Sequence, residues 1–325
     1  MNVTIVGGAG FIGLNLARHL LDRGDSVTLF DRAELPAAAR RACAPHEKRL
    51  RLLQGDVTDR ASVETAIGAG TDALVLGAAI TADAARDAAE PERILAVNLL
   101  AQIPILEAAR RAKLRRVINL SSGSAYGASG QLSPLLDETM PCDPQSLYAI
   151  SKFASERVAA RLADLWQTDV VSVRLSAVFG PFERPGGVRD TPSPQAQILD
   201  CMLRGKPALL DTPGPRDWIY AVDVAEAVGH LLDAQKLRHA LYNISGGASF
   251  TALAWGERIA ALRPGLICRL VRAGEAPTVT VHGPPRAPLS TARLADEFGW
   301  RAKFGCEASA THLHRWLCDH HGDQG

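Results

Sequence analysis

The segment Val3-Thr-Ile-Val-Gly-Gly-Ala-Gly-Phe-Ile-Gly13 decides the fold of the chain. An apolar run typical of a strand ends at Gly7, and further glycines follow at the start of a segment with helical periodicity. In such a turn one glycine allows the tight bend, one lets the backbone approach a pyrophosphate, and one lets the helix pack on the strand. The helix N-terminus attracts phosphate. A tight turn without a ligand is the alternative. The residues expected to bind a dinucleotide are Gly7, Gly10, Phe11, Ile12 and Gly13.

Short apolar runs alternate with longer amphipathic segments over the first 180 residues. We expect strands at 2–6, 26–30, 50–54, 73–76, 116–120 and 170–175, and helices at 11–23, 60–67, 91–112 and 147–167. This alternation predicts an α/β fold, a Rossmann-type doubly wound parallel sheet, over residues 1–180. Residues 181–325 are expected to form a smaller C-terminal α/β part that binds substrate, with segments returning to the Rossmann core.

Acidic residues follow the next two expected strands. Asp31 closes the second strand, where a carboxylate hydrogen-bonds the adenosine ribose 2′-hydroxyl and repels a 2′-phosphate. NAD is therefore the expected cofactor, although Arg32 could accommodate the 2′-phosphate of NADP. Asp56 and Val57 follow the third strand. Asp56 could take the adenine amino group, or it could be a turn or helix-capping residue.

Tyr148 and Lys152 lie four residues apart in the expected helix 147–167, so their side chains share one face. A phenol is a poor base near neutral pH, but a neighbouring ammonium group lowers its pKa by favouring the phenolate. Tyr148 would exchange a proton with a substrate hydroxyl while Lys152 bonds the nicotinamide ribose. Exposed helical pairs without a function have the same spacing.

A serine-rich stretch, Leu120-Ser-Ser-Gly-Ser-Ala-Tyr-Gly127, ends the fifth expected strand. Ligands of parallel sheets bind at this carboxyl edge. One serine could hold the reacting hydroxyl toward Tyr148, or the stretch could be a polar turn that merely caps the strand. Because the glycine loop, the serines and the Tyr–Lys pair occur in this order, the sequence favours a hydride-transfer site.

These motifs resemble the extended short-chain dehydrogenase/reductase family, the NAD-dependent epimerase/dehydratase group. Three further matches bring the resemblance to nearly the whole chain: Arg174-Leu-Ser-Ala-Val-Phe-Gly-Pro181, Arg216-Asp-Trp-Ile-Tyr-Ala-Val-Asp223, and Ser290-Thr-Ala-Arg with Phe298-Gly-Trp300. The resemblance implies an NAD-dependent epimerase or oxidoreductase. It would act by hydride transfer at a hydroxyl-bearing carbon of a sugar, in the first place a nucleotide sugar.

The resemblance also implies roles for the catalytic and substrate-binding residues. Tyr148 is the acid/base, and Lys152 lowers its pKa and binds ribose. Ser122 is the active-site hydroxyl, with Ser124 as the alternative. Arg216 would reach an anionic substrate group, unless it is a surface residue paired with its neighbour Asp217.

Further cofactor contacts are implied along the same cleft. Asn98 matches an asparagine of the family, and a polar contact that supports its helix is an equal alternative. The set expected to contact the dinucleotide is completed by Leu76, Ala78, Ala79, Asn98, Ser121 and Val178.

Two departures from the family pattern narrow the chemistry. Gly123 and Ser124 stand where the 4,6-dehydratases carry the Asp-Glu pair that they need to eliminate water, so dehydration is not expected. Ala177 stands where sugar-nucleotide epimerases often carry an asparagine for the substrate phosphates. An NAD-dependent dehydrogenase or reductase of a free sugar or sugar acid therefore stays open. So does a non-catalytic dinucleotide-sensing protein, against which Tyr148 and Lys152 argue.

Two stretches rich in Pro and Gly, 182–195 and 273–288, interrupt the C-terminal part. The first reads as a surface loop that could act as a lid. We interpret Arg189, His282 and Arg286 as solvated loop residues, although each could close over a substrate.

Composition excludes several classes of function. The 325 residues carry 36 Lys plus Arg against 35 Asp plus Glu, a balance that argues against a nucleic-acid partner. The 6 cysteines have neither disulfide-motif nor zinc-ligand spacing, so no metal is expected. We find no signal-peptide pattern or apolar run of membrane length, and we expect a cytoplasmic protein without membrane contact. Apolar residues on more than one face of the helices 91–112 and 147–167 predict a homodimer.

Overall fold

The computed structural model describes residues 1–68, 70–184, 190–263, 265–283 and 285–321. Within these residues the main layer is a seven-stranded parallel sheet with the order β11-β6-β5-β4-β1-β2-β3. Its strands are β1 (Asn2–Val6), β2 (Ser26–Asp31), β3 (Leu50–Gln54), β4 (Ala73–Leu76), β5 (Arg116–Ser122), β6 (Val170–Leu175) and β11 (Leu241–Ile244). The Rossmann-type fold class is confirmed.

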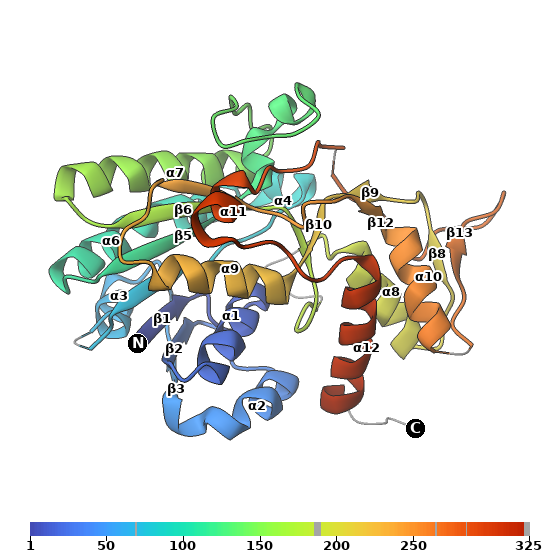
Figure 1. Cartoon of the computed structure of the whole chain (residues 1–325), viewed down its shortest axis with the longest axis horizontal. Coiled ribbons are helices and arrows are strands. Elements are labelled where there is room, and N and C mark those ends of the chain that lie inside the picture. Colours follow the sequence, from blue (N-terminus) through green and yellow to red (C-terminus); the bar gives the residue numbers. More distant parts are fainter. Residues whose placement is uncertain (69, 185–189, 264, 284, 322–325) are drawn as a thin grey trace.

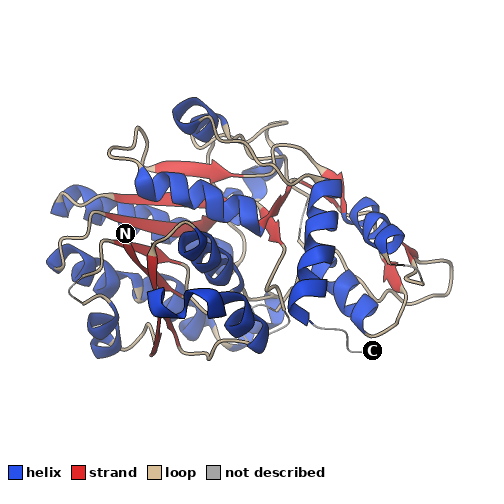
Figure 2. Cartoon of the chain, turned by 60° about the horizontal axis from the view of Figure 1, so that its bottom comes forward, coloured by secondary structure: helices blue, strands red, loops and turns tan. Residues whose placement is uncertain are grey.

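Helices cover both faces of this sheet (Figure 1, Figure 2). One face carries α1 (Phe11–Asp22) and α9 (Ala221–Asp233), with α2 (Ala37–Cys43), η1 (Ala44–Arg49) and α11 (Ala292–Phe298) at its edges. The other carries α3 (Arg60–Ala66), α4 (Ala84–Ala89), α5 (Pro91–Leu95), η2 (Ala96–Leu100), α6 (Gln102–Arg111) and α7 (Leu147–Trp166). Side chains alternate along a strand, so Ile5 joins the core under α1 and α9 while Val6 joins the opposite core.

The strand order reverses between β1 and β4. The chain runs from β1 through β2 to β3 and then returns to β4 on the other side of β1. Ligands of open parallel sheets bind at the carboxyl ends of the strands beside such a switch point. Gly7 lies there with φ +79, and a Cβ on it would lie 2.5 Å from the backbone nitrogen of Ala78. Only glycine fits where the loops after β1 and β4 meet.

The expected helix 91–112 is interrupted. Pro104 has no N–H group to donate to the carbonyl of Leu100, and the first part of the segment cannot continue regularly into α6. The π-helical turn η2 takes up the mismatch, with the Ala101 nitrogen donating to the Ala96 carbonyl at 2.9 Å. This turn places Asn98 in the buried interior.

A smaller C-terminal part lies at one end of the sheet, on the right in Figure 1. It comprises α8 (Pro194–Leu203), α10 (Ala252–Leu262), α12 (Cys306–His321) and the short strands β7 (Ala177–Phe179), β8 (Ala208–Leu210), β9 (Pro215–Arg216), β10 (Trp218–Tyr220), β12 (Phe250–Thr251) and β13 (Cys268–Leu270). Phe179, Trp255 and Leu313 lie in its own core. The division into residues 1–180 and 181–325 stays a prediction.

Two later segments belong to the large sheet: β11 pairs with β6, and α9 packs on α1. The expected lid 182–195 falls partly on residues 185–189, so Arg189 lies outside the described residues. No described helix has both the length and the apolar character needed to cross a membrane.

Candidate active site

A cleft of about 530 Å³ opens along the carboxyl ends of β1 to β4. Helix α1 begins at its wall, and its N-cap residue Gly10 contributes no side-chain hydrogen bond, which leaves the first amides of the helix for a ligand. This is the arrangement that a pyrophosphate requires. The predicted residues that line the cleft are Gly7, Gly10, Phe11, Asp31, Arg32, Asp56, Val57, Ala78 and Ala79.

Backbone amides fix the carboxylate of Asp31 at the edge of this cleft. Its Oδ2 accepts a hydrogen bond from the Ala9 nitrogen at 3.0 Å, and its Oδ1 accepts one from the Ala33 nitrogen at 2.9 Å. Asp31 thus joins the glycine loop to the end of β2. A carboxylate in this place fits the hydroxyls of an adenosine ribose and repels a 2′-phosphate.

Asp56 has the turn role that the sequence left as one of two alternatives, and its contact with an adenine amino group stays a prediction. Its Oδ1 accepts hydrogen bonds from the nitrogen of Thr58 at 2.9 Å and from its hydroxyl at 2.8 Å, which makes a turn after β3. These bonds hold the pKa of Asp56 below its usual value, so the side chain stays anionic. It also lines the cleft, while the N-cap of α3 is Asp59.

The other predicted cofactor residues lie apart from the cleft lining. A Cβ on Gly13 would lie 2.6 Å from the Gly7 carbonyl oxygen, so Gly13 serves the packing of helix on strand, directly after Ile12. Val178 is buried in β7 beside Ile219 of β10. Leu76, Asn98 and Lys152 line a small cavity of about 20 Å³ that shares Val57, Ala78 and Val97 with the cleft.

Asn98 supports the helices around the site. Its amide nitrogen donates to the Ile80 carbonyl at 3.0 Å and to Ser151 Oγ at 3.1 Å, and its oxygen accepts from the Ile80 nitrogen at 2.7 Å. The loop after β4, which lines the cleft, is thereby joined to α7. The supporting contact considered as the alternative is the one that the structure contains.

Helix α7 presents Tyr148 and Lys152 to the end of β5. Lys152 Nζ lies 6.0 Å from the centre of the Tyr148 ring and donates to the Leu120 carbonyl at 2.8 Å. Burial lowers the pKa of Lys152 to about 8, although the nearby charge of Glu156 acts in the opposite direction and raises it. The ammonium group is therefore present at neutral pH and is lost in mildly alkaline solution.

Ser122 ends β5 and begins the turn η3 (Gly123–Tyr126). Its Oγ accepts a hydrogen bond from the Ser124 nitrogen at 3.1 Å and so caps the turn. Because α7 packs on both β5 and η3, Ser122 lies where the helix that carries Tyr148 and Lys152 meets the end of β5. Ser124 is exposed to solvent.

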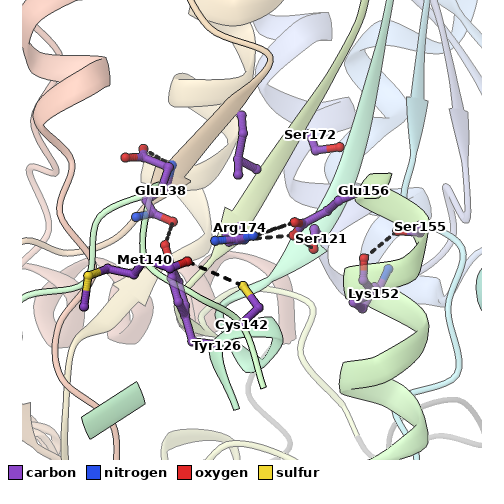
Figure 3. A network of polar contacts seen from close by, with 12 residues as sticks. Ser121, Tyr126, Glu138, Met140, Cys142, Lys152, Ser155, Glu156, Ser172 and Arg174 are labelled. Carbon is purple, nitrogen blue, oxygen red and sulfur yellow. Dashed lines mark hydrogen bonds and ion pairs between the residues drawn. The ribbon is translucent and has the colours of Figure 1, made fainter. Parts of the chain in front are cut away.

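A buried ion pair joins helix α7 to strand β6 (Figure 3). Arg174 on β6 contacts Glu156 on α7 at 2.7 and 3.0 Å, and Ser121 donates its hydroxyl proton to the same carboxylate. The Arg174 guanidinium also lies 4.6 Å from the centre of the Tyr126 ring. Hydrogen bonds and charge from Glu156 raise the pKa of Arg174 despite its burial. Ser121 thus serves this pair in the structure, and the cofactor contact expected of it stays a prediction.

The substrate side of the site contains two arginines near one carboxylate. Arg216 is partly buried, stacks 5.5 Å from the Trp218 ring centre and donates to the Gly283 carbonyl at 3.2 Å. The ion-pair partner of Asp217 is Arg286, at 3.2 Å. Burial, and secondly the charge of Arg286, lower the pKa of Arg216.

Arg286 corrects one interpretation from the sequence. A solvated loop residue was expected, but its side chain is 13% exposed and packs against Gly123. His282, by contrast, bonds Thr280 at 2.8 Å in an exposed position. The described residues contain no cluster of His, Cys, Asp and Glu suited to a metal ion.

Comparison with known proteins bears on this geometry. Residues 3–245 match the model of the "NAD dependent epimerase/dehydratase family". The chain belongs to this family. The resemblance found in the sequence and the enzyme class that it implies are confirmed.

Individual relatives differ in their reactions. The chain is 32% identical to a dTDP-glucose 4,6-dehydratase of Mycolicibacterium smegmatis over 71% of its length and 69% of the relative's. It is 26% identical to a probable UDP-glucuronate 4-epimerase of Rhizobium meliloti over 71% and 68% of the two lengths. The fold matches UDP-glucose 4-epimerase from Bifidobacterium longum, solved with NAD+ and UDP, with a TM-score of 0.80, 22% identity and 98% coverage of both chains.

Several residues of the site were missed from the sequence. Glu156 lies one helical turn beyond Lys152, and this repeated spacing was a usable signal. The glycines 123 and 130 were the signal for Arg286, because each leaves space for its side chain. The cleft lining that was not predicted consists of Ala9, Ala33, Gly55, Thr58, Ile80, Arg93, Ala96, Val97, Phe182, Glu183 and Arg184.

Proposed function

We propose that the protein transfers a hydride between NAD and a hydroxyl-bearing carbon of a nucleotide sugar, with Tyr148 as the acid/base. The observation that carries this proposal is the packing of α7, with Tyr148 and Lys152, on the end of β5, where Lys152 bonds the Leu120 carbonyl two residues before Ser122. The family of the chain is NAD-dependent, which agrees with the cleft at the switch point.

NAD, when bound, supplies the hydride acceptor. The residues of this chain handle the proton. The buried ammonium of Lys152 favours the phenolate of Tyr148, which takes the proton of a sugar hydroxyl. Ser122 Oγ accepts a hydrogen bond from the Ser124 nitrogen. Its own hydroxyl proton therefore stays available to donate to the sugar hydroxyl and hold it in place.

The features of the cleft support NAD rather than NADP. The glycine loop and the uncapped start of α1 would hold the pyrophosphate, and Asp31 would hold the adenosine ribose. Asp56 stays anionic near the adenine end of the cleft. Arg32 also lines this region, and it is the residue that a 2′-phosphate would contact.

An epimerase or an oxidoreductase fits the site better than a dehydratase. Elimination of water needs an additional acid and base, and the positions after Ser122 hold Gly123 and Ser124. Arg216, partly buried beside Trp218, would meet the diphosphate of a nucleotide sugar. Ala177 has no polar side chain for that group, and this observation favours the second candidate, a dehydrogenase or reductase of a free sugar or sugar acid.

We also propose that the protein is a cytoplasmic homodimer. Leu100, Ile103 and Ile150 are 57%, 37% and 41% exposed on neighbouring helices of one face, and a second copy of the chain would cover them. The six cysteines are unpaired, which suits a reducing compartment. Sedimentation of the wild type and of a variant with Ile103→Lys tests the dimer, and a monomeric wild type would exclude it.

The reaction is tested with candidate sugars and NAD in solution. Net formation of reduced cofactor identifies an oxidoreductase, and conversion of the sugar without it identifies an epimerase. Substrates are UDP-glucose, UDP-glucuronic acid and the corresponding free sugars. Turnover of free sugars alone would replace the nucleotide-sugar proposal by the second candidate, and absence of any turnover would reject both.

A further inference from the structure

Two glycines of the active-site segment form a slot that the side chain of Arg286 fills. A Cβ atom on Gly123 would lie 1.9 Å from Nη1 and 2.7 Å from Cζ of Arg286, and a Cβ on Gly130 would lie 2.9 Å from its Cγ. Atoms at such distances clash, so neither position tolerates a side chain while Arg286 keeps this place. Gly123 follows Ser122 directly. While Arg286 keeps this place, the slot leaves no room for a side chain at position 123 and places a guanidinium group beside Ser122 instead.

The backbone on both sides of Arg286 is attached to the same segment. The Ala287 nitrogen donates to the Gly130 carbonyl at 2.9 Å, and the side chain of Gln131 donates to the Pro285 carbonyl at 3.0 Å. These bonds hold the start of the Arg286 side chain independently of its charge. The guanidinium is thus presented to the site by a built contact between the serine segment and the C-terminal part.

The guanidinium of Arg286 has unused hydrogen-bonding capacity. Its Nη2 donates to Asp217 at 3.2 Å and to Ser176 at 3.4 Å, while its Nε is buried without a hydrogen-bond partner. Asp217 also accepts from Ser245 Oγ at 3.1 Å through its other oxygen. Arg216 is close enough for its charge to interact with that of Arg286. The guanidinium of Arg286 therefore lies near one acid, Asp217, and one further arginine, Arg216.

We propose that Arg286 determines substrate specificity by binding a carboxylate on the sugar, and that the substrate is a nucleotide-linked sugar acid. This inference rests on the proposed function. The fork of a guanidinium matches a carboxylate with two parallel hydrogen bonds. A neutral hexose offers the guanidinium no charged partner beyond Asp217, to which it makes one hydrogen bond. Because Arg286 packs against Gly123, a carboxylate that it binds would lie next to the reacting carbon of the sugar at Ser122.

Binding to the NAD-loaded protein tests this proposal by calorimetry. We expect the wild type to bind UDP-glucuronic acid at least about ten-fold more tightly than UDP-glucose, because a charge-assisted contact contributes about that much. The variant Arg286→Gln should bind both sugars equally, with its affinity for UDP within about three-fold of the wild type. Gly123→Ala keeps the charge but displaces the guanidinium, and it should lose the same preference.

The matched control is Arg204→Gln, which removes an exposed arginine paired with Asp200 on α8. Its preference should equal that of the wild type. If Arg286→Gln fails to fold because Asp217 is left unpaired, Gly123→Ala decides the question. Equal binding of both sugars by the wild type would overturn the inference while leaving the proposed hydride transfer intact. A loss of UDP affinity as large as the loss for UDP-glucuronic acid would also overturn it, since Arg286 would then bind the nucleotide. Absence of UDP-sugar binding by every protein would instead reject the nucleotide-sugar function.

Discussion

Two buried arginine–carboxylate pairs flank the serine segment, and they differ in how completely they are satisfied. Arg174 and Glu156 are 4% and 5% exposed and meet through several short bonds inside the Rossmann part. Arg286 and Asp217 are 13% and 0% exposed and meet through one bond of 3.2 Å. We call these the closed pair and the open pair.

The difference between the pairs indicates different roles, the closed pair holding helix α7 on the sheet and the open pair binding a ligand. The closed pair joins α7 to β6, and its acid also receives the Ser121 hydroxyl proton, so it has little to offer a ligand. Each pair keeps one buried arginine nitrogen without a hydrogen-bond partner, Nη1 of Arg174 and Nε of Arg286, but only the open pair has a second arginine, Arg216, beside it. A buried pair of like charges is destabilising by itself, and functional sites are where such arrangements are kept.

The largest expected effect is that of replacing Tyr148, which lies on the helix that the closed pair joins to β6. Tyr148→Phe removes the phenol that exchanges the proton and leaves both ion pairs in place. We expect the rate of sugar turnover to fall roughly 10²–10⁴-fold, the usual contribution of a positioned acid/base. The measurement is single-turnover conversion of the sugar. NAD affinity, followed by calorimetry, should stay unchanged, and a variant with wild-type turnover would remove Tyr148 from the mechanism.

Stability is expected to distinguish the two pairs next. Glu156→Gln leaves the buried guanidinium of Arg174 without a counter-charge, and we expect a loss of about 3 kcal/mol in the free energy of unfolding. Asp217→Asn should cost less, about 2 kcal/mol, the contribution of one hydrogen bond between charged groups, because Arg286 makes a single contact with Asp217 and is 13% exposed. Urea unfolding of the NAD-loaded variants measures both. Equal losses would mean that the open pair is as much a part of the framework as the closed one.

The closed pair belongs to the part of the molecule that the sequence predicts well. Strands such as 2–6 and 170–175 were expected with the bounds that the structure has, because their apolar runs are buried on both faces. The glycine loop and Tyr148–Lys152 spacing are local, so the sequence alone places them. Glu156 continues the same local spacing.

The open pair illustrates what the sequence could not show. Arg286 lies far along the chain from Gly123, and only tertiary packing brings the two together. Helix α12 was missed for a similar reason. It contains four His and two Cys, which are weak helix formers, and the burial of Leu313 and Leu317 in the C-terminal core stabilises it.

Arg216→Gln sharpens the comparison on the ligand side with a smaller effect. This change removes the arginine beside the open pair, so that Arg286 loses a like-charged neighbour. We expect the affinity for UDP to fall about ten-fold, because one charge-assisted contact with the diphosphate is lost. The free energy of unfolding should change by less than about 1 kcal/mol. Calorimetry and urea unfolding check the two expectations, and a large loss of stability with unchanged UDP affinity would assign Arg216 to the framework.

The smallest expected effect is a shift in pH dependence that only the closed pair should cause. Burial lowers the pKa of Lys152 from 10.5 to about 8. Lys152 therefore loses its proton as the pH rises through about 8, Tyr148 loses its cationic neighbour, and kcat should fall on the alkaline side. For stability the sign is opposite. The cost of burying the ammonium is fully present below pH 8 and disappears as the pH rises toward 10.5.

Glu156→Gln tests whether the closed pair acts on this titration. The charge of Glu156 raises the pKa of Lys152, so its removal should move the alkaline limb of kcat to lower pH. We expect a shift of less than about one pH unit, since Arg174 already neutralises most of that charge. Asp217→Asn, in the open pair, should leave the limb in place. The pH profiles of the three proteins measure this directly. If the Glu156→Gln limb coincides with that of the wild type, the closed pair holds α7 on β6 by packing and hydrogen bonds alone, and its charge has no part in proton transfer.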